Sequence, residues 1–317
     1  MAETTWDAVQ REFWQLYQSG AYAEALDLVT RHETLFPRRG RFYNWKMCMA
    51  ARVNDIPLAL QTLQEAVDAG LWFSHASLRE DEDLDSLQGL PEFERLAAIC
   101  EERYAAAVAQ ATPQLLIAEP EHASPPYPLL VALHGNNSNS ETSVDSWRSA
   151  ANRGWLLTLP QSSQLGDFDG YVWNDRERAT AEVRQHDATT RREYAIDPAR
   201  VVIGGFSMGG GLAVWLAVSG AIEARGFIAV GPYLEDVGLL RPLLKARPDR
   251  KLRGYIVVGD QDDPCYRISQ EIAALLQAHD IACELEVYPN LGHVFPPSFE
   301  ESLAKGLDFI LRNNVQK

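Results

Sequence analysis

The segment Gly205-Phe206-Ser207-Met208-Gly209 places a serine between two glycines, after an apolar run and before a helix-like run. A serine on a sharp strand-to-helix turn needs neighbours without side chains two positions away on each side, because strand and helix must approach closely. The following helix would supply an aligned dipole and a free N–H at Met208. This context favours a nucleophile elbow over a simple glycine-rich turn, and Ser207 is the predicted nucleophile.

A serine hydroxyl is a poor nucleophile unless a base accepts its proton. His293 follows the last apolar run of the chain, Glu284–Tyr288, and precedes the last helix-like run. We therefore predict His293 as the general base. His134 directly follows an early strand and is expected to hold its loop by a hydrogen bond. The remaining histidines lie in helical or linker positions.

An imidazole base needs a carboxylate that fixes its tautomer and stabilises the imidazolium. Three aspartates compete for this role in Gly259-Asp260-Gln261-Asp262-Asp263, after an apolar run. Asp262, three residues after Gly259, is the preferred candidate, and Asp263 is the next. Asp260 suits a turn or capping position. These three residues occur in the chain order serine, aspartate, histidine.

Acyl transfer also needs donors for the oxyanion that develops on the carbonyl oxygen. His134-Gly135-Asn136 follows the apolar run Leu129–Leu133. The backbone N–H of Asn136 could pair with that of Met208, and Gly135 would let the chain turn toward the site. We predict these two N–H groups as the oxyanion hole.

Together, these segments resemble the α/β-hydrolase superfamily. Gly-Phe-Ser-Met-Gly-Gly from Gly205 and Gly-His-Val-Phe-Pro from Gly292 are most similar to phospholipase/carboxylesterase and dienelactone-hydrolase-like esterases. The resemblance covers roughly residues 111–317 and implies Ser207 as nucleophile, His293 as base and Asp262 as acid. Dienelactone hydrolases proper use a cysteine, so the serine argues against that particular activity.

The resemblance also implies pocket residues in the loop Gly170–Asp175. Esterases of this kind often carry an aromatic side chain there that walls the acyl or alcohol pocket, which points to Trp173 and Tyr171. The alternative is an aromatic side chain that packs beneath the loop. Phe295, Tyr233 and Tyr266 are weaker pocket candidates.

The elements that must position these residues alternate along the second part of the chain. Apolar runs predict seven strands, and several read as parallel strands buried on both faces. Such alternation predicts a doubly wound, mostly parallel α/β sheet, with ligands at the carboxyl ends of its strands. The expected strands are 114–117, 129–133, 156–159, 201–203, 226–230, 254–258 and 284–288, and the expected helices are 144–152, 177–193, 208–219, 267–279 and 298–312.

Details around these elements carry further expectations. Ser298-Phe299-Glu300-Glu301 has the spacing of a capping box at the start of the last helix. Many lipases insert a helical lid over the active site between two late strands. Few residues separate the strand that ends at Val230 from the one that starts at Gly254, so little room exists for such a lid here. That shortage favours short acyl chains as substrates.

Residues 1–110 read as helices only, which predicts an all-α helical-hairpin domain before a catalytic domain at 111–317. Ala25 and Ala59 lie 34 positions apart in similar runs, and this is the tetratricopeptide period. The first 70 residues resemble tetratricopeptide repeats, although Ala59 has no matching proline. The domain is expected to cap the catalytic domain, to restrict substrate size, or to mediate self-association or binding of a protein partner. Asp81–Asp85 is expected to be a solvated turn.

Composition narrows the class of partner. The 44 acidic against 29 basic residues give a formal charge of −15, which disfavours nucleic acid and anionic membranes. No apolar run approaches the about 20 residues that span a bilayer, and the first residues lack a signal peptide's basic and apolar regions. Four scattered cysteines show no metal-binding spacing. We expect a cytoplasmic protein without membrane insertion, metal or organic cofactor.

These features predict a serine carboxylesterase that cleaves small-molecule esters through an acyl-enzyme. A thioesterase or a lysophospholipase could use the same residues. The alternative from another class is a non-catalytic scaffold, in which a repeat domain is fused to a degenerate hydrolase.

Overall fold

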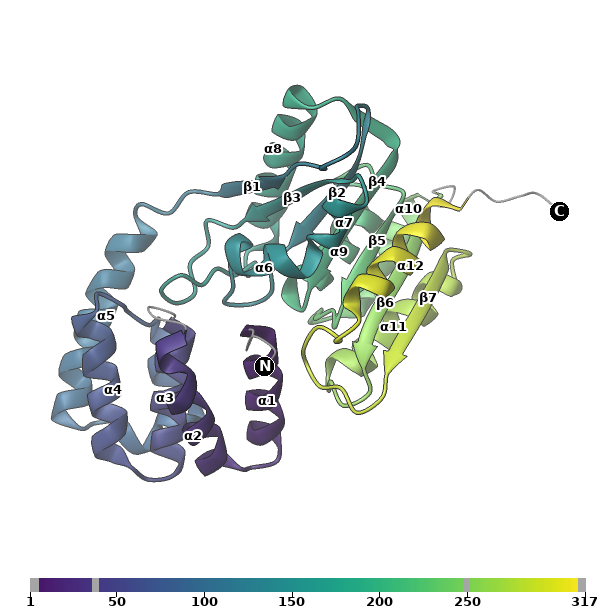
Figure 1. The fold of residues 1–317 in the computed structure, drawn as a ribbon. Coiled ribbons are helices and arrows are strands. Elements are labelled where there is room, and N and C mark those ends of the chain that lie inside the picture. The colour runs from purple at the N-terminus through teal and green to yellow at the C-terminus, as the bar shows by residue number, and fades with distance from the viewer. Residues whose placement is uncertain (1–5, 36–39, 248–250, 313–317) are drawn as a thin grey trace. The chain divides into compact units, whose positions relative to one another are not determined.

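The computed structural model describes residues 6–35, 40–247 and 251–312. The chain divides into two compact units (Figure 1). One comprises Met1–Ala111 together with Leu165–Gly170, and the other comprises Thr112–Gln164 together with Tyr171–Lys317.

The first unit consists of helices joined by short loops, together with the loop Leu165–Gly170, which confirms the predicted all-α character of the N-terminal part of the chain. Helix α3 packs against both α2 and α4, and Ala25 of α2 and Ala59 of α4 are fully buried. An aromatic cluster completes the core, in which Phe13 stacks on Trp45 with ring centroids 4.0 Å apart. The elements are α1 (Trp6–Gln18), α2 (Tyr22–His32), a short 3₁₀ helix (Glu33–Leu35), α3 (Gly40–Arg52), α4 (Ile56–Asp68), a π-helical turn (Ala76–Glu80), a second 3₁₀ helix (Glu82–Leu87) and α5 (Pro91–Val108).

The acidic stretch Asp81–Asp85 is not a solvated turn, and that prediction was wrong. Asp81 accepts a hydrogen bond from the backbone N–H of Asp83 and begins the 3₁₀ helix. The Asp83 side chain is buried and lies 3.5 Å from the guanidinium of Arg52. Burial therefore raises the pKa of the Asp83 carboxyl.

The second unit contains a seven-stranded sheet in the order β1-β3-β2-β4-β5-β6-β7. Strand β1 runs antiparallel to β3 and all other neighbours are parallel, which confirms the predicted doubly wound, mostly parallel fold. The seven predicted strands are all present. They are β1 (Gln114–Ala118), β2 (Tyr127–Leu133), β3 (Leu156–Gln161), β4 (Ile196–Phe206), β5 (Gly226–Val230), β6 (Arg253–Gly259) and β7 (Ala282–Tyr288).

Helices cover both faces of this sheet (Figure 1). Alternate residues of β2 point to opposite faces, since Leu129 and Val131 join one buried cluster while Leu130 and Ala132 join the other. On the first face lie α8 (Arg176–Glu193), α9 (Met208–Ser219), α10 (Leu240–Ala246) and α11 (Cys265–Gln277). On the second face lie α6 (Ser140–Trp147), α7 (Ser149–Asn152) and α12 (Phe299–Leu311).

Helix α10 was not predicted from the sequence. It lies between β5 and β6, where many lipases insert a lid. Leu240 and Leu244 are buried and join the same core cluster as α9. These two leucines attach the connection to the core.

Among the residues that the structure describes, none of the helices combines the length and the apolar character that a membrane span requires.

The fully buried Trp147 of α6 is expected to be a main support of the second face. Its ring lies so close to β4 that a Cβ on Gly204 would come within 2.7 Å of it. We expect Trp147→Ala to lower the free energy of unfolding by about 3–5 kcal/mol, because it removes a large side chain and leaves a cavity. Trp215→Ala, at a half-buried tryptophan on α9, should cost no more than about 1–2 kcal/mol. Equal losses in urea denaturation of the two variants would contradict this assignment.

Candidate active site

Ser207 occupies the tight turn between β4 and α9, with a φ of 55° and a ψ of −121°. A positive φ in a residue with a side chain is strained, and such turns are typical of nucleophile elbows. The flanking glycines make the turn possible. A Cβ on Gly205 would run into the backbone of Gly209, and a Cβ on Gly209 would run into the carbonyl oxygens of Leu133 and His134.

The structure brings Ser207, Asp262 and His293 together at the carboxyl ends of β4, β6 and β7. His293 Nε2 lies 2.8 Å from Ser207 Oγ, and His293 Nδ1 lies 2.9 and 3.0 Å from the two carboxylate oxygens of Asp262. Ser207 is 7% exposed and Asp262 is 3% exposed. A carboxylate that accepts from Nδ1–H leaves the Nε2 lone pair free to accept the serine proton, so the arrangement can activate the hydroxyl.

The three competing aspartates have separate surroundings. Asp262 is buried against His293, whereas Asp263 is exposed. Asp260 accepts a 2.7 Å hydrogen bond from the backbone N–H of Asn290 and so holds the loop that leads to His293. Gly231 leaves room for the pair, since a Cβ there would lie 2.8 Å from Asp262 Oδ2 and 3.3 Å from His293 Nδ1.

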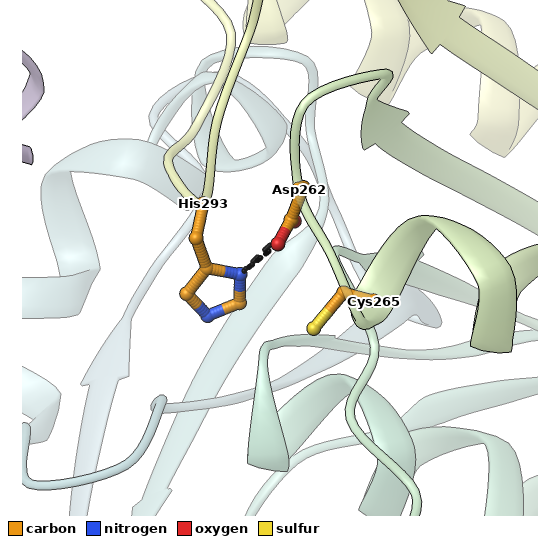
Figure 2. A group of neighbouring side chains, drawn as sticks. All are labelled: Asp262, Cys265 and His293. Atoms are coloured by element: carbon orange, nitrogen blue, oxygen red, sulfur yellow. Dashed lines mark hydrogen bonds and ion pairs between the residues drawn. The ribbon is translucent and has the colours of Figure 1, made fainter. Parts of the chain in front are cut away.

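Cys265 lies beside Asp262 and His293 (Figure 2). Each of these three residues offers a possible metal ligand, and the ligand atoms lie within 4.8 Å of one another. Burial, with a smaller contribution from the charge of Asp262, raises the pKa of the Cys265 thiol. A metal ion there would draw the imidazole and the carboxylate away from Ser207, so it would compete with the arrangement just described. A second such group, in the helical unit, is Cys48, Asp81 and Asp83.

The predicted oxyanion segment lies next to the elbow, since Leu133 of β2 pairs with Gly205 of β4. His134 is buried, its Nδ1 lies 2.9 Å from the Gly135 carbonyl oxygen, and Ser162 N–H points at its Nε2 over 3.4 Å. Burial lowers the pKa of His134 to about 4. The ring is therefore neutral at pH 7, with Nδ1–H as donor and Nε2 as acceptor. The oxyanion roles of Asn136 and Met208 remain predictions.

The predicted pocket aromatics lie in three different settings. Trp173 is 4% exposed, stacks on His134 at 4.5 Å and donates from Nε1 to the His134 carbonyl oxygen over 2.9 Å, so it packs beneath the loop. Tyr171 is half-buried and pairs through its backbone with Ser138. Phe295 stacks on Phe206 at 4.7 Å, and Phe206 lies against His293 at 4.9 Å.

The two weaker pocket candidates contact the site through their backbones. Tyr233 N–H donates to the carbonyl oxygen of Ser207, and Tyr266 N–H donates to that of Asp262. The Tyr233 side chain is 42% exposed.

A buried glutamate behind the site escaped the sequence analysis. Glu182 of α8 accepts hydrogen bonds from the Ser163 backbone N–H and from the hydroxyls of Ser162 and Ser163, and it pairs with Arg178. This network holds the chain segment that contacts His134. A lone glutamate in a highly charged helix gives no sign of burial.

Two family profiles match this chain. The profile of the dienelactone hydrolase family matches residues 163–305, and that of the A/B hydrolase-like N-terminal domain matches residues 7–108. The chain belongs to the α/β-hydrolase superfamily. The tetratricopeptide resemblance of the helical unit remains a prediction.

Several known proteins are similar to this chain. An uncharacterised protein from Bacillus cereus ATCC 10987 is 28% identical, with a TM-score of 0.56 over 97% of this chain and 99% of that one. The Bacillus cereus carboxylesterase, at 17% identity and a TM-score of 0.50 over 65% of this chain and 98% of that one, shares the fold. Acyl-protein thioesterase 1 from Emericella nidulans is 26% identical over 166 residues, which are 50% of this chain and 68% of that protein. The family profile and this relative support a hydrolase of the esterase or thioesterase type.

The low pKa of His134 predicts a pH dependence of stability. Between about pH 4 and 6.5 the unfolded chain binds a proton at this histidine that the native state does not. The free energy of unfolding should therefore be highest above pH 6.5. It should fall by up to about 3 kcal/mol as the pH drops toward 4. His134→Asn keeps an N–H near the Gly135 carbonyl, but asparagine does not titrate. The free energy of unfolding of this variant should therefore fall less steeply between pH 6.5 and pH 4. Urea denaturation of both proteins from pH 7 to pH 4 provides the measurement, and parallel pH profiles would contradict the prediction.

Proposed function

We propose that this chain is a serine carboxylesterase that works through an acyl-enzyme. Ser207 is the nucleophile, His293 the general base and Asp262 the residue that orients the imidazole. The observation that carries the proposal is the continuous line of hydrogen bonds from Asp262 through His293 to a serine on a strained elbow. A serine turn alone would be compatible with many functions, but an imidazole 2.8 Å from its hydroxyl activates it.

In the first half-reaction, Ser207 Oγ attacks the ester carbonyl carbon while His293 Nε2 accepts the hydroxyl proton. The negative charge that forms on the carbonyl oxygen is stabilised by the backbone N–H groups of Asn136 and Met208, and by the N-terminal end of α9. When the tetrahedral intermediate collapses, the imidazolium gives its proton to the departing alcohol. Ser207 then carries the acyl group as an ester.

In the second half-reaction, His293 removes a proton from water, and the hydroxide formed attacks the acyl-enzyme. Collapse of the second intermediate releases the carboxylic acid and returns the proton to Ser207 Oγ. Asp262 accepts the hydrogen bond from Nδ1–H in both half-reactions and so holds the imidazole in the required tautomer. The chemistry needs no group beyond these side chains, the two backbone donors and water.

Carboxylic esters with short acyl chains are the proposed substrates. The connection between β5 and β6, where a lid would be inserted, instead contributes α10 to the core. The second candidate is an acyl thioester, which the similarity to acyl-protein thioesterase 1 of Emericella nidulans favours. Comparing kcat/KM across acyl chain lengths for oxygen esters and matching thioesters separates the two candidates.

Ser207→Ala should abolish ester hydrolysis. We expect kcat/KM for a chromogenic short-chain ester to fall by about 10⁴-fold or more, because no other group can form the acyl-enzyme. A fluorophosphonate should label the unmodified protein at Ser207 and leave the variant unlabelled. If the folded, unmodified protein shows neither hydrolysis nor labelling, the scaffold alternative is favoured.

Asp262→Asn and Asp263→Asn form a matched pair, since the same charge is removed at adjacent positions. An amide in place of the Asp262 carboxylate would donate to Nδ1 and favour the wrong imidazole tautomer, so Asp262→Asn should lower kcat by about 10³–10⁴-fold. Asp263 is exposed, so Asp263→Asn should stay within about twofold of the unmodified enzyme. A larger loss at Asp263 than at Asp262 in steady-state kinetics would overturn this assignment.

A further inference from the structure

Six residues from the hydrolase part of the sequence, Leu165–Gly170, belong to the helical unit. The chain leaves the hydrolase unit after Gln164 and returns to it at Tyr171. The two ends of this excursion are joined by a 2.8 Å hydrogen bond from Val172 N–H to the Gln164 carbonyl. The Gln164 side chain also exchanges two hydrogen bonds with the backbone of Asp175. Residues Leu165–Gly170 therefore form a loop whose two ends are joined by hydrogen bonds.

Within the helical unit, Asp167 anchors this loop. Asp167 is 5% exposed, and its carboxylate accepts three hydrogen bonds from residues at and just before the π-helical turn. Ser74 donates its backbone N–H over 2.7 Å and its hydroxyl over 2.8 Å to Oδ1, while the Ser77 hydroxyl donates to Oδ2 over 2.8 Å. Burial of a carboxylate is costly unless donors replace water around it, and these donors do so.

Neighbouring residues of the loop strengthen the anchor. Phe168 N–H donates to the Trp72 carbonyl over 3.1 Å, and the two rings meet edge to face. The Tyr104 hydroxyl donates to the Leu165 carbonyl over 3.4 Å. Contacts on both sides of Asp167 thus hold the loop at one place on the helical unit.

Within the hydrolase unit, the residues that directly follow this loop hold the two predicted oxyanion segments. Tyr171 and Ser138 exchange two backbone hydrogen bonds of 2.8 and 3.3 Å. Trp173 Nε1 donates to the His134 carbonyl, and its backbone N–H points at Met208 Sδ over 3.2 Å. The segment Tyr171–Trp173 therefore ties down the chain on both sides of Asn136, and also Met208.

We propose that Asp167 is a positioning residue for ester hydrolysis. Its hydrogen bonds to Ser74 and Ser77 fix the loop from which the Tyr171–Trp173 segment emerges, and that segment in turn fixes the backbone donors of the oxyanion hole. The helical unit thereby contributes to transition-state stabilisation through this loop. This inference rests on the proposed esterase function.

The size of the effect follows from how an oxyanion hole works. Its donors act only when they are aimed at the oxygen that becomes negative, and losing one donor costs about 10²–10³-fold in kcat. Releasing the anchor would loosen the donors rather than remove them. A smaller loss of kcat is expected, and KM should change little, because the affected interaction forms mainly in the transition state.

The test compares Asp167→Ala with Asp169→Asn in the full-length protein. Asp169 lies on the same loop, is exposed and has a positive φ that asparagine tolerates, so Asp169→Asn is the matched control for loss of charge. We expect Asp167→Ala to lower kcat for the short-chain ester about tenfold or more with KM within about twofold, and the control to match the unmodified enzyme. Asp167→Asn keeps one acceptor oxygen and should recover part of kcat.

Hydrogen–deuterium exchange provides a readout that does not depend on activity. Asp167→Ala should speed exchange of the amides of Ser138 and Tyr171 about tenfold or more, while the control leaves them unchanged. If Asp167→Ala does not fold, Asp167→Asn and Ser77→Ala serve the same test with milder changes. Unchanged kcat and unchanged exchange in folded variants would overturn the inference. An unmodified protein inactive on every ester would contradict the proposed function, and the exchange result would still decide the role of Asp167.

Discussion

The site depends on the hydrogen bond between His293 Nε2 and Ser207 Oγ. This bond can form only if the strands of the sheet pair in the observed register. Ser207 follows β4, while Asp262 and His293 follow β6 and β7. The pairing of Phe206 with Val230, of Val230 with Val257 and of Gly259 with Tyr288 brings these strand ends to one edge. A shift of one residue in the register of any strand pair would move a strand end by about 3 Å. Such a shift would break the hydrogen bond between His293 and Ser207. Gly205, Gly209 and Gly231 remove the side chains that would block this approach.

Most of this framework could be predicted from the sequence because its signals are local. A parallel strand buried on both faces is a short apolar run whatever surrounds it, and β5 (Gly226–Val230) and α9 (Met208–Ser219) begin and end where the pattern indicated. The site residues could be proposed for a related reason. In a parallel sheet, loops after strands meet at one edge, so a serine, an aspartate and a histidine that follow three strands have few other places to lie.

Other features could not be predicted, because their causes are contacts between distant parts of the chain. Ser298 has the spacing of a capping box, yet it makes no side-chain cap, and its hydroxyl instead bonds with that of Tyr288. Trp173 was a candidate wall of the pocket, but the carbonyl of His134 draws its indole beneath the loop. Asp167 meets donors that lie 90 and 93 positions earlier. Neither the periodicity nor the composition of the sequence identifies such partners. A polar residue in a loop gives the same sequence pattern whether its side chain is solvated or buried.

The anchoring of Leu165–Gly170 changes what the helical unit can be expected to do. A gate that restricts substrate size requires helices in front of the nucleophile, and a partner-binding repeat requires a free surface. Positioning through Asp167 requires neither, because the effect travels along the covalent chain from a loop held in one unit to a segment hydrogen-bonded in the other. A boundary near residue 111 therefore does not contain the whole helical unit. The helical unit is completed by six residues from beyond that boundary, and those residues continue directly into the segment that holds the chain around Asn136.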